Sequence, residues 1–229
     1  MNLAAKIVGL VVIALAPAFA DNLLVVGGPT TGTFSNQTAG TLHLGDSSWT
    51  YAGSGDFSST LTFLSGDLGF LGVTPVGPFV IGILTDDNND ARGKHDTADT
   101  TVTANLDVNV PFLFPTLDTV SFDGSGLTVS VEENFNAAHD DQVQGLNNFE
   151  GQTAGFTYNG QQYLVTLEGF YSHFLNQSGG PISSFDTADG SNSAYLWADI
   201  TAVPEPSSAI LLITICGMAG LTLRQRRKA

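Results

Sequence analysis

Apolar and polar residues alternate along most of the chain between residues 21 and 202. The clearest stretch is Thr101–Val110, TVTANLDVNV, in which valine, alanine or leucine occupies every second position and threonine, asparagine or aspartate occupies the others. Because successive side chains of a β-strand point to opposite faces, this period of two predicts a strand with one buried and one exposed face. The same criterion predicts further short strands at 41–44, 48–51, 59–63, 79–84, 127–131, 163–167 and 195–200.

Turn-forming residues separate these stretches. Asp123-Gly124 and Asn159-Gly160 have the composition of two-residue hairpin turns, and Asn-Gly is the stronger signal. Helical periodicity is weak: the best candidate, Glu132–Phe149, has an incomplete apolar stripe interrupted by asparagine and glycine, and we interpret it as a long loop with a single turn. Many short strands without helices between them predict an all-β fold, an antiparallel two-sheet sandwich with a jelly-roll-like order.

The first twenty residues have a different pattern. Lys6 provides a positive charge, residues 7–15 are apolar apart from Gly9, and Ala18-Phe19-Ala20 places small residues on both sides of a phenylalanine. This arrangement predicts a signal peptide over residues 1–20 that is cleaved after Ala20. A retained N-terminal membrane helix is the alternative, and the shortness of the apolar run favours the signal peptide.

The last residues combine three features. A Pro204-Glu205-Pro206 triplet precedes an uncharged, largely apolar run over 207–223, which is followed by a basic cluster formed by Arg224, Arg226, Arg227 and Lys228. At roughly 1.5 Å per residue, a helix over 207–223 is about 26 Å long, enough to cross a thin hydrocarbon core. The basic cluster would then remain on the cytoplasmic side. We therefore predict a transmembrane helix at 207–223.

This three-part tail resembles the PEP-CTERM sorting signal of Gram-negative bacteria, with Pro204, Glu205 and Pro206 as the box and Arg224, Arg226 and Arg227 in the basic end. The resemblance implies export, transient anchoring in the inner membrane, recognition by an exosortase and removal of the tail. The final location would be the cell envelope or the extracellular matrix. The chain then divides into a signal peptide at 1–20, one β-sandwich domain at 21–202 and a sorting segment at 203–229.

Three short pieces of the domain resemble the choice-of-anchor K domain, a module of exported bacterial proteins. They are Gly32–Asn36 near the start, Phe79–Thr85 followed by Asn88 or Asn89 in the middle, and Asn192–Ile200 at the end. The resemblance implies a β-sandwich without an assigned biochemical role, and it supplies no catalytic residues.

Composition narrows the classes of partner. Arg92 and Lys94 are the only arginine and lysine residues between positions 21 and 202, whereas all of the 22 acidic residues except Glu205 lie there. A surface of this charge repels phosphates, so neither nucleic acid nor an anionic lipid surface is an expected partner. The one cysteine, Cys216, lies in the tail, and the domain must therefore be stable without disulfides.

One acidic stretch is a candidate calcium site. Asp86, Asn88 and Asp90 occupy alternate positions, like the first ligands of a calcium-binding loop. The remainder of an EF-hand loop is missing, because Ala91 and Thr97 stand where glycine and a bidentate glutamate are required. Two interpretations stay open: a solvated acidic turn, which we favour, and a calcium site of another type with further aspartates downstream.

Catalytic patterns are incomplete. Gly45-Asp46-Ser47-Ser48 resembles the nucleophile block of GDS-type esterases, yet no histidine of the chain has an aspartate three residues before it. The histidines are scattered without metal-ligand spacing. Adjacent acids such as Glu132-Glu133 and Asp140-Asp141 do not establish the geometry of a glycosidase. We therefore predict that the protein is not an enzyme and has no cofactor other than the calcium ion just considered.

Aromatic residues offer a second kind of binding site. Sugars stack on exposed rings, and the candidate rings are Trp49, Tyr51, Tyr171 and Trp197. Trp49 and Tyr51 are two residues apart and share a face of a regular strand, where packing in the core is the favoured alternative. The leading hypothesis is an exported, non-catalytic structural or adhesive protein of the envelope or exopolysaccharide. The alternative is a carbohydrate-binding, lectin-like module, with calcium as an aid.

Overall fold

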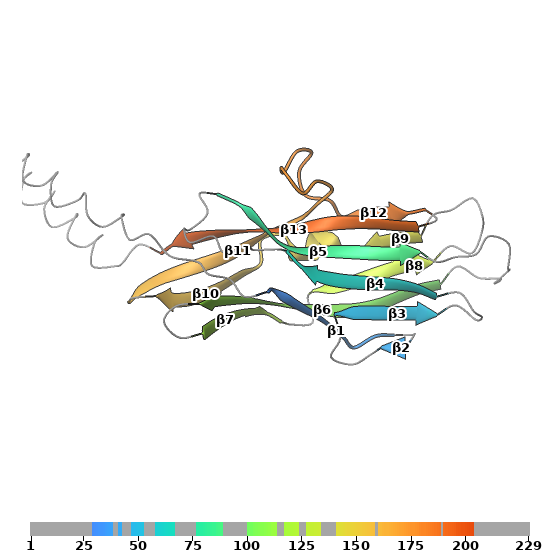
Figure 1. Ribbon diagram of the computed structural model, residues 1–229, viewed down its shortest axis with the longest axis horizontal. Helices are drawn as coiled ribbons and strands as arrows, with labels where there is room; N and C mark the ends of the chain where they lie inside the picture. The colour runs from blue at the N-terminus through green and yellow to red at the C-terminus, as the bar shows by residue number, and fades with distance from the viewer. Residues whose placement is uncertain are drawn as a thin grey trace, which may run out of the picture.

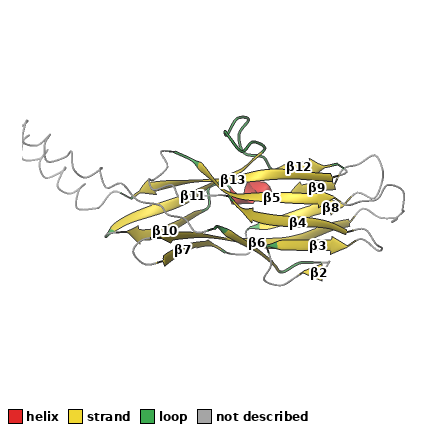
Figure 2. Cartoon of the chain, viewed as in Figure 1, coloured by secondary structure: helices red, strands yellow, loops and turns green. Residues whose placement is uncertain are grey.

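Strands make up most of the described part of the chain. The computed structural model describes residues 29–38, 41–42, 47–52, 58–66, 77–88, 100–113, 117–123, 127–133, 141–158, 160–188 and 190–203. These residues form two antiparallel sheets around one hydrophobic core (Figure 1). In Figure 2 the short 3-10 turn η2 (Leu146–Phe149) lies among the strands. The predicted all-β sandwich is confirmed.

The first sheet has six strands in the order β1-β6-β8-β9-β12, with β7 paired to β6. They are β1 (Thr31–Ser35), β6 (Thr100–Leu113), β7 (Leu117–Phe122), β8 (Thr128–Glu133), β9 (Asp141–Gln144) and β12 (Ser184–Thr187). Val108 and Asn109 of β6 each pair with both β1 and β7, and Asn105 pairs with both β1 and β8. One edge of β6 therefore holds β1, and its other edge holds β7 and β8 one after the other.

The second sheet has seven strands in the order β10-β11-β13-β5-β4-β3-β2. They are β2 (Thr41–Leu42), β3 (Ser48–Ala52), β4 (Ser58–Ser65), β5 (Phe79–Asn88), β10 (Thr153–Tyr158), β11 (Gln161–Tyr171) and β13 (Gly190–Ala202). The C-terminal strand β13 lies inside this sheet, because β11 pairs with one of its edges and β5 with the other.

The core consists of the inward-facing side chains of both sheets. On β6 the buried residues are Val102, Ala104, Leu106, Val108 and Val110, the alternate positions that the sequence pattern predicted. The second sheet contributes fully buried residues such as Ile81 and Leu196. Because apolar burial stabilises by about 25 cal/mol per Å², this continuous core accounts for a stable domain without disulfides.

The two hairpin predictions have opposite outcomes. Asn159-Gly160 joins β10 to β11, whose residues pair directly from Tyr158 with Gln161 onward, and Gly160 has the positive φ of 80° that such a turn needs. The prediction of a hairpin at Asp123-Gly124 is wrong. There β7 and β8 pair with β6 and not with each other, since both lie along the same edge of that strand.

The strand count was underestimated. All eight predicted stretches overlap observed strands, but the sequence pattern missed β1, β7, β9, β10 and β12. The segment interpreted as a long loop with one turn contains the end of β8, the short strand β9 and the turn η2. Within the second sheet, β2, β3, β4 and β5 follow one another as a meander.

The predicted targeting segments lie outside the described residues. These are the signal peptide at 1–20 and the transmembrane helix at 207–223. Within the part of the chain that the structure describes, no helix has the length and apolar character needed to cross a membrane.

Candidate functional site

The outer face of the seven-stranded sheet carries a group of aromatic and acidic side chains. Leu196 and Ala198 of β13 are fully buried in the core, so the alternating residues Tyr195, Trp197 and Asp199 point to the opposite, outer face. Gly169, on the neighbouring strand β11, pairs with Trp197. We call this group the outer aromatic face and define it as Glu150, Glu168, Tyr171, Phe174, Tyr195, Trp197 and Asp199.

Two edge-to-face ring pairs form its aromatic part. The ring centroids of Tyr171 and Trp197 lie 6.1 Å apart, with an angle of 69° between the ring planes. Those of Phe174 and Tyr195 lie 5.5 Å apart, with an angle of 64°. Phe174 belongs to the loop after β11, drawn in orange where it rises above the strands in Figure 1. Phe174 is 46% exposed and the next residue, Leu175, is 84% exposed. Two exposed apolar side chains therefore lie on this loop, whereas the rings of Tyr171 and Trp197 are almost buried.

Two irregularities flank Trp197. The pairing of β11 with β13 shifts between Leu167 and Gly169, which leaves Glu168 as an extra residue in β11. The pairing of β13 with β5 shifts between Leu196 and Trp197. Such bulges bend a strand and redirect its side chains, and here the bulge in β11 turns Phe170 into the core and Tyr171 to the outer face.

Gly169 is required at the first bulge. Its φ is +98°, a conformation that other residues rarely adopt. A Cβ atom at this position would lie 3.0 Å from the Cβ atom of Pro181 and 3.5 Å from that of Glu150. The bulge thus brings the chain after η2 and the loop after β11 close to β11, beside Glu168.

Three carboxylates share this surface. Burial raises the pKa of the Glu168 carboxyl above its ordinary value, and the negative charges of Asp199 and Glu150 raise it further. Burial also raises the pKa of the Tyr171 hydroxyl, with added repulsion from Glu168 and Glu150. Aromatic rings beside carboxylates are suited to sugars, because rings stack on the C–H faces of a sugar and carboxylates accept hydrogen bonds from its hydroxyls.

A second group of polar side chains lies between the two sheets. We call it the interior polar cluster and define it as Ser59, Asp86, Asn88, Asp141 and Thr187, from β4, β5, β9 and β12. Asp86 and Thr187 are 0% exposed, Asp141 is 2% exposed and Ser59 is 3% exposed. Two carboxylates are therefore enclosed among the apolar side chains of a sandwich, an uncommon place for charged groups.

Long hydrogen bonds connect the cluster. The Ser59 hydroxyl Oγ lies 3.3 Å from Asn88 Oδ1 and 3.4 Å from Asp141 Oδ2. Asn88 Nδ2 donates to the backbone carbonyl of Thr187 at 3.3 Å. Asp86 precedes Asn88 by two residues, and Thr187 pairs directly with Asp141 across β9 and β12. The Thr187 hydroxyl Oγ1 is buried and makes no hydrogen bond.

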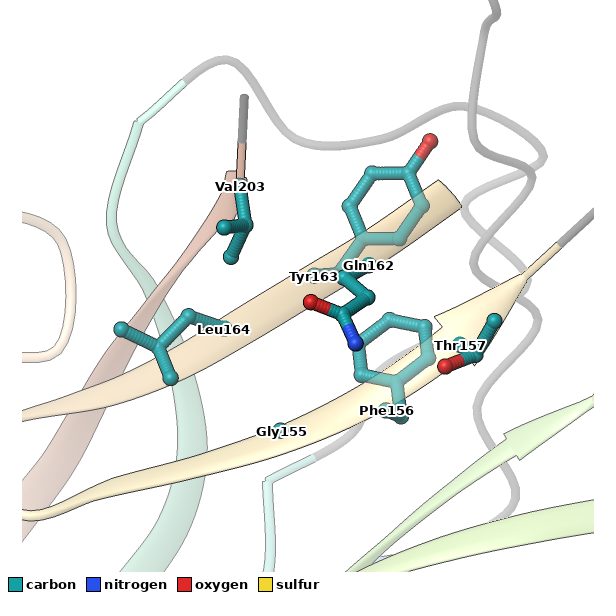
Figure 3. Close-up of a pocket in the computed structure, with 7 residues that line it drawn as sticks. All are labelled: Gly155, Phe156, Thr157, Gln162, Tyr163, Leu164 and Val203. Atoms are coloured by element: carbon teal, nitrogen blue, oxygen red, sulfur yellow. The ribbon is translucent and has the colours of Figure 1, made fainter. Parts of the chain in front are cut away.

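A shallow groove of about 330 Å³ lies on the β10–β11 hairpin (Figure 3). Its lining residues are Gly155, Phe156, Thr157, Gln162, Tyr163, Leu164 and Val203. Gly155 contributes no side chain to the groove. The rings of Phe156 and Tyr163 are stacked, with centroids 5.3 Å apart and an angle of 17° between the ring planes. The backbone N–H of Val203 donates to the Gln162 carbonyl at 2.8 Å. No acid, base or metal ligand stands among these lining side chains.

The predicted ligand residues are separated by the fold. Trp49 is 0% exposed and packs against Phe34, with ring centroids 6.1 Å apart. Trp49 is therefore a core residue and not a sugar platform, which is the alternative that the sequence favoured. The side chain of Tyr51 lies outside the described residues. Tyr171 and Trp197, which the sequence also singled out, do meet, on the outer face.

The predicted calcium residues are only partly described. Asp86 is buried in β5 and Asn88 ends that strand, whereas Asp90 lies outside the described residues. Asp86 is therefore an interior residue here and not part of a solvated turn. Across the described ranges, no three histidine, cysteine, aspartate or glutamate side chains are grouped so as to hold a metal ion. Glu132 accepts a hydrogen bond from Gln144 Nε2 at 2.8 Å within the first sheet.

Comparison with known protein families gives one match. A model described as the PEP-CTERM protein-sorting motif matches residues 202–228. The motif indicates an exported protein that is anchored in the membrane before cleavage by an exosortase. Comparison with curated proteins found no match. The motif residues Pro204, Glu205, Pro206, Arg224, Arg226 and Arg227 lie outside the described part of the chain. The resemblance of the domain to the choice-of-anchor K domain gains no support from these matches and stays a prediction.

Proposed function

We propose that this protein, once exported and processed, is a non-catalytic structural or adhesive component of the cell envelope or of the exopolysaccharide matrix. The observation that carries the proposal is the position of the sorting motif. The motif begins at Ala202, the last residue of β13, so the sandwich lies directly beside the sorting signal without a spacer. Removal of the tail would deliver the sandwich itself as the product.

The character of the domain supports this role. None of the described residues is a lysine or arginine, whereas aspartate and glutamate occur on most of the strands. Such a surface stays hydrated and repels its own copies, which suits a protein that must remain dispersed in a hydrated matrix until it meets its partner. The two-sheet core provides rigidity without disulfides.

Processing is tested by intact mass spectrometry of the membrane, envelope and medium fractions of producing cells. We expect the main product to lack Leu211–Ala229 when the exosortase is present and to keep those residues in a Pro204→Ala, Glu205→Ala, Pro206→Ala variant. The matrix role is tested by deleting the gene and measuring the amount and cohesion of the exopolysaccharide. A main wild-type product ending at Ala229, or a matrix unchanged by the deletion, would contradict the proposal.

Carbohydrate binding is the second candidate function, and the outer aromatic face favours it. Phe174 and Tyr195 offer rings near the surface, and Glu168 and Asp199 offer hydroxyl acceptors farther along the same outer face, beyond Tyr171 and Trp197. The Trp197 indole Nε1 is buried without a hydrogen-bond acceptor, so a small rearrangement of the covering loop would expose a donor for a sugar oxygen.

Binding is tested with a glycan array and with purified exopolysaccharide. We expect Phe174→Ala and Tyr195→Ala to weaken binding by about tenfold, since loss of one stacking ring typically costs 1–2 kcal/mol. Leu64→Ala is the control, because Leu64 is also exposed, at 49%, but lies on β4, separated from Tyr195 by strand β5, and belongs to neither ring pair. Equal losses in all three variants, or no glycan signal for the wild type, would reject this function.

A further inference from the structure

The interior polar cluster has the composition of a cation site. Asp86 and Asp141 supply two carboxylates, Asn88 supplies an amide oxygen, and Ser59 and Thr187 supply hydroxyl oxygens. Hard cations such as calcium take six to eight oxygen ligands, and carboxylates, amide carbonyls and hydroxyls are all oxygen donors. The two negative charges equal the charge of one divalent cation.

The distances in the cluster favour calcium. Oxygen–oxygen hydrogen bonds have their usual length near 2.7–2.8 Å, whereas Ser59 Oγ lies 3.3 Å and 3.4 Å from the oxygens of Asn88 and Asp141. Two ligands at about 2.4 Å from a calcium ion and at right angles to each other are about 3.4 Å apart. The corresponding separation around magnesium, with ligands at about 2.1 Å, is about 3.0 Å. The two separations from Ser59 Oγ therefore match those between neighbouring ligands of a calcium ion.

Thr187 provides an independent observation. Its side chain is 0% exposed, and its hydroxyl oxygen has no hydrogen-bond partner. Because Thr187 pairs directly with Asp141, the two side chains lie on the same, inward face of the first sheet. A buried hydroxyl without a partner destabilises the fold, and valine would fill the same volume without that cost. A ligand in the cluster would satisfy this oxygen.

We propose that the interior polar cluster binds one calcium ion, with Asp86, Asn88, Asp141, Ser59 and Thr187 as its protein ligands. The ion would join β4 and β5 of one sheet to β9 and β12 of the other. This site goes beyond the proposed function, because it requires neither processing by an exosortase nor a sugar ligand.

The test measures calcium binding to the full-length chain, purified in a mild detergent and freed of metal with a chelator. Isothermal titration with calcium chloride should give one bound ion per chain. At a calcium concentration about 100 times the dissociation constant, the melting temperature should rise by about 5–10 °C. Sodium chloride at the same ionic strength and magnesium chloride at the same concentration should each produce a clearly smaller rise.

Matched substitutions separate binding from general charge effects. Asp141→Asn and Thr187→Val should each weaken calcium binding by at least about tenfold, and Thr187→Val should leave the metal-free melting temperature equal or higher. Thr30→Val is the control for Thr187, because Thr30 is 2% exposed and its hydroxyl also lacks a partner, but it precedes β1, outside the cluster. Asp186→Asn is the control for Asp141, because Asp186 is exposed and adjoins Thr187.

Three results would overturn the proposal. One is a wild-type shift that sodium or magnesium reproduces in full. Another is a calcium affinity that both Asp141→Asn and Thr187→Val leave unchanged. The third is an equal loss of affinity in Asp186→Asn or Thr30→Val, which would indicate an effect of overall charge or packing. Because Thr187→Val keeps the shape of the side chain, it remains informative even if Asp141→Asn does not fold.

Discussion

The two faces of the seven-stranded sheet place carboxylates in opposite surroundings. On the inner face, Asp86 is closed off from solvent two residues before Asn88, whose side-chain oxygen lies 3.3 Å from the Ser59 hydroxyl. On the outer face, Glu168 and Asp199 lie beside aromatic rings and keep contact with solvent. Oxygen ligands without solvent suit a bound cation, whereas rings with solvated acids suit a hydroxyl-rich surface. The side of the sheet on which an acid lies therefore decides which partner it can serve.

The largest expected effect comes from two neighbouring residues of β13 that face opposite ways. We expect Leu196→Ala to lower the free energy of unfolding by about 2–5 kcal/mol, because Leu196 is fully buried and its loss leaves a cavity. Tyr195→Ala should cost only about 1 kcal/mol, since Tyr195 is partly exposed and its ring meets the Phe174 ring edge to face. Urea denaturation of both variants measures the difference. Equal losses would mean that the outer face is as tightly packed as the core.

The next effect concerns the bulge of the outer face. Gly169→Ala should destabilise by about 1–3 kcal/mol, because φ is +98° and the new Cβ would lie 3.0 Å from Pro181 Cβ. Gly179→Ala is the matched control, with φ +88° and no atom within 4 Å of its Cβ position. Thermal melting of the two variants isolates the cost of crowding from that of the backbone conformation. A Gly169→Ala variant no less stable than the control would show that the bulge yields without cost.

The smallest effect is the pH dependence of Glu168. Its folded pKa is raised above the ordinary value of 4.5, so the folded protein holds this proton more tightly than the unfolded chain does. The stability that the protonated Glu168 contributes is fully present below the unfolded pKa of 4.5. It is lost as the pH rises from 4.5 through the higher folded pKa. Glu168→Gln should therefore raise the melting temperature slightly at pH 7 and leave it nearly unchanged at pH 4. An increase of the same size at both values would contradict this account of Glu168.

The sequence predicted the strands of the core better than those of the polar regions. Thr101–Val110 alternates strictly, and its inward residues are all buried in β6. The strands β9 and β12 were missed because Asp141 and Thr187 occupy inward positions that normally hold apolar residues. A search for alternating apolar residues does not recognise such strands. Their inward polar residues are instead the ones that form the interior polar cluster.

The candidate sites were predictable only in pieces. Asp86 and Asn88 were found because they alternate along one strand, but Ser59, Asp141 and Thr187 join them from distant parts of the chain. Likewise, Tyr171 and Trp197 were recognised as aromatic candidates, but their meeting depends on the pairing of β11 with β13 and on the bulge between Leu167 and Gly169. Pairing between distant strands leaves no mark in local sequence, and the sites therefore required the three-dimensional structure.

The placement of β13 determines how the domain carries mechanical load. Because β13 is flanked by β11 and β5 and leads directly into the sorting segment, tension applied along it from the tail acts in shear on two ladders of hydrogen bonds at once. A strand at the rim of a sheet would instead peel away one bond at a time. While the tail holds the protein at the membrane, the domain is thus attached through a strand that is hydrogen-bonded along both of its edges.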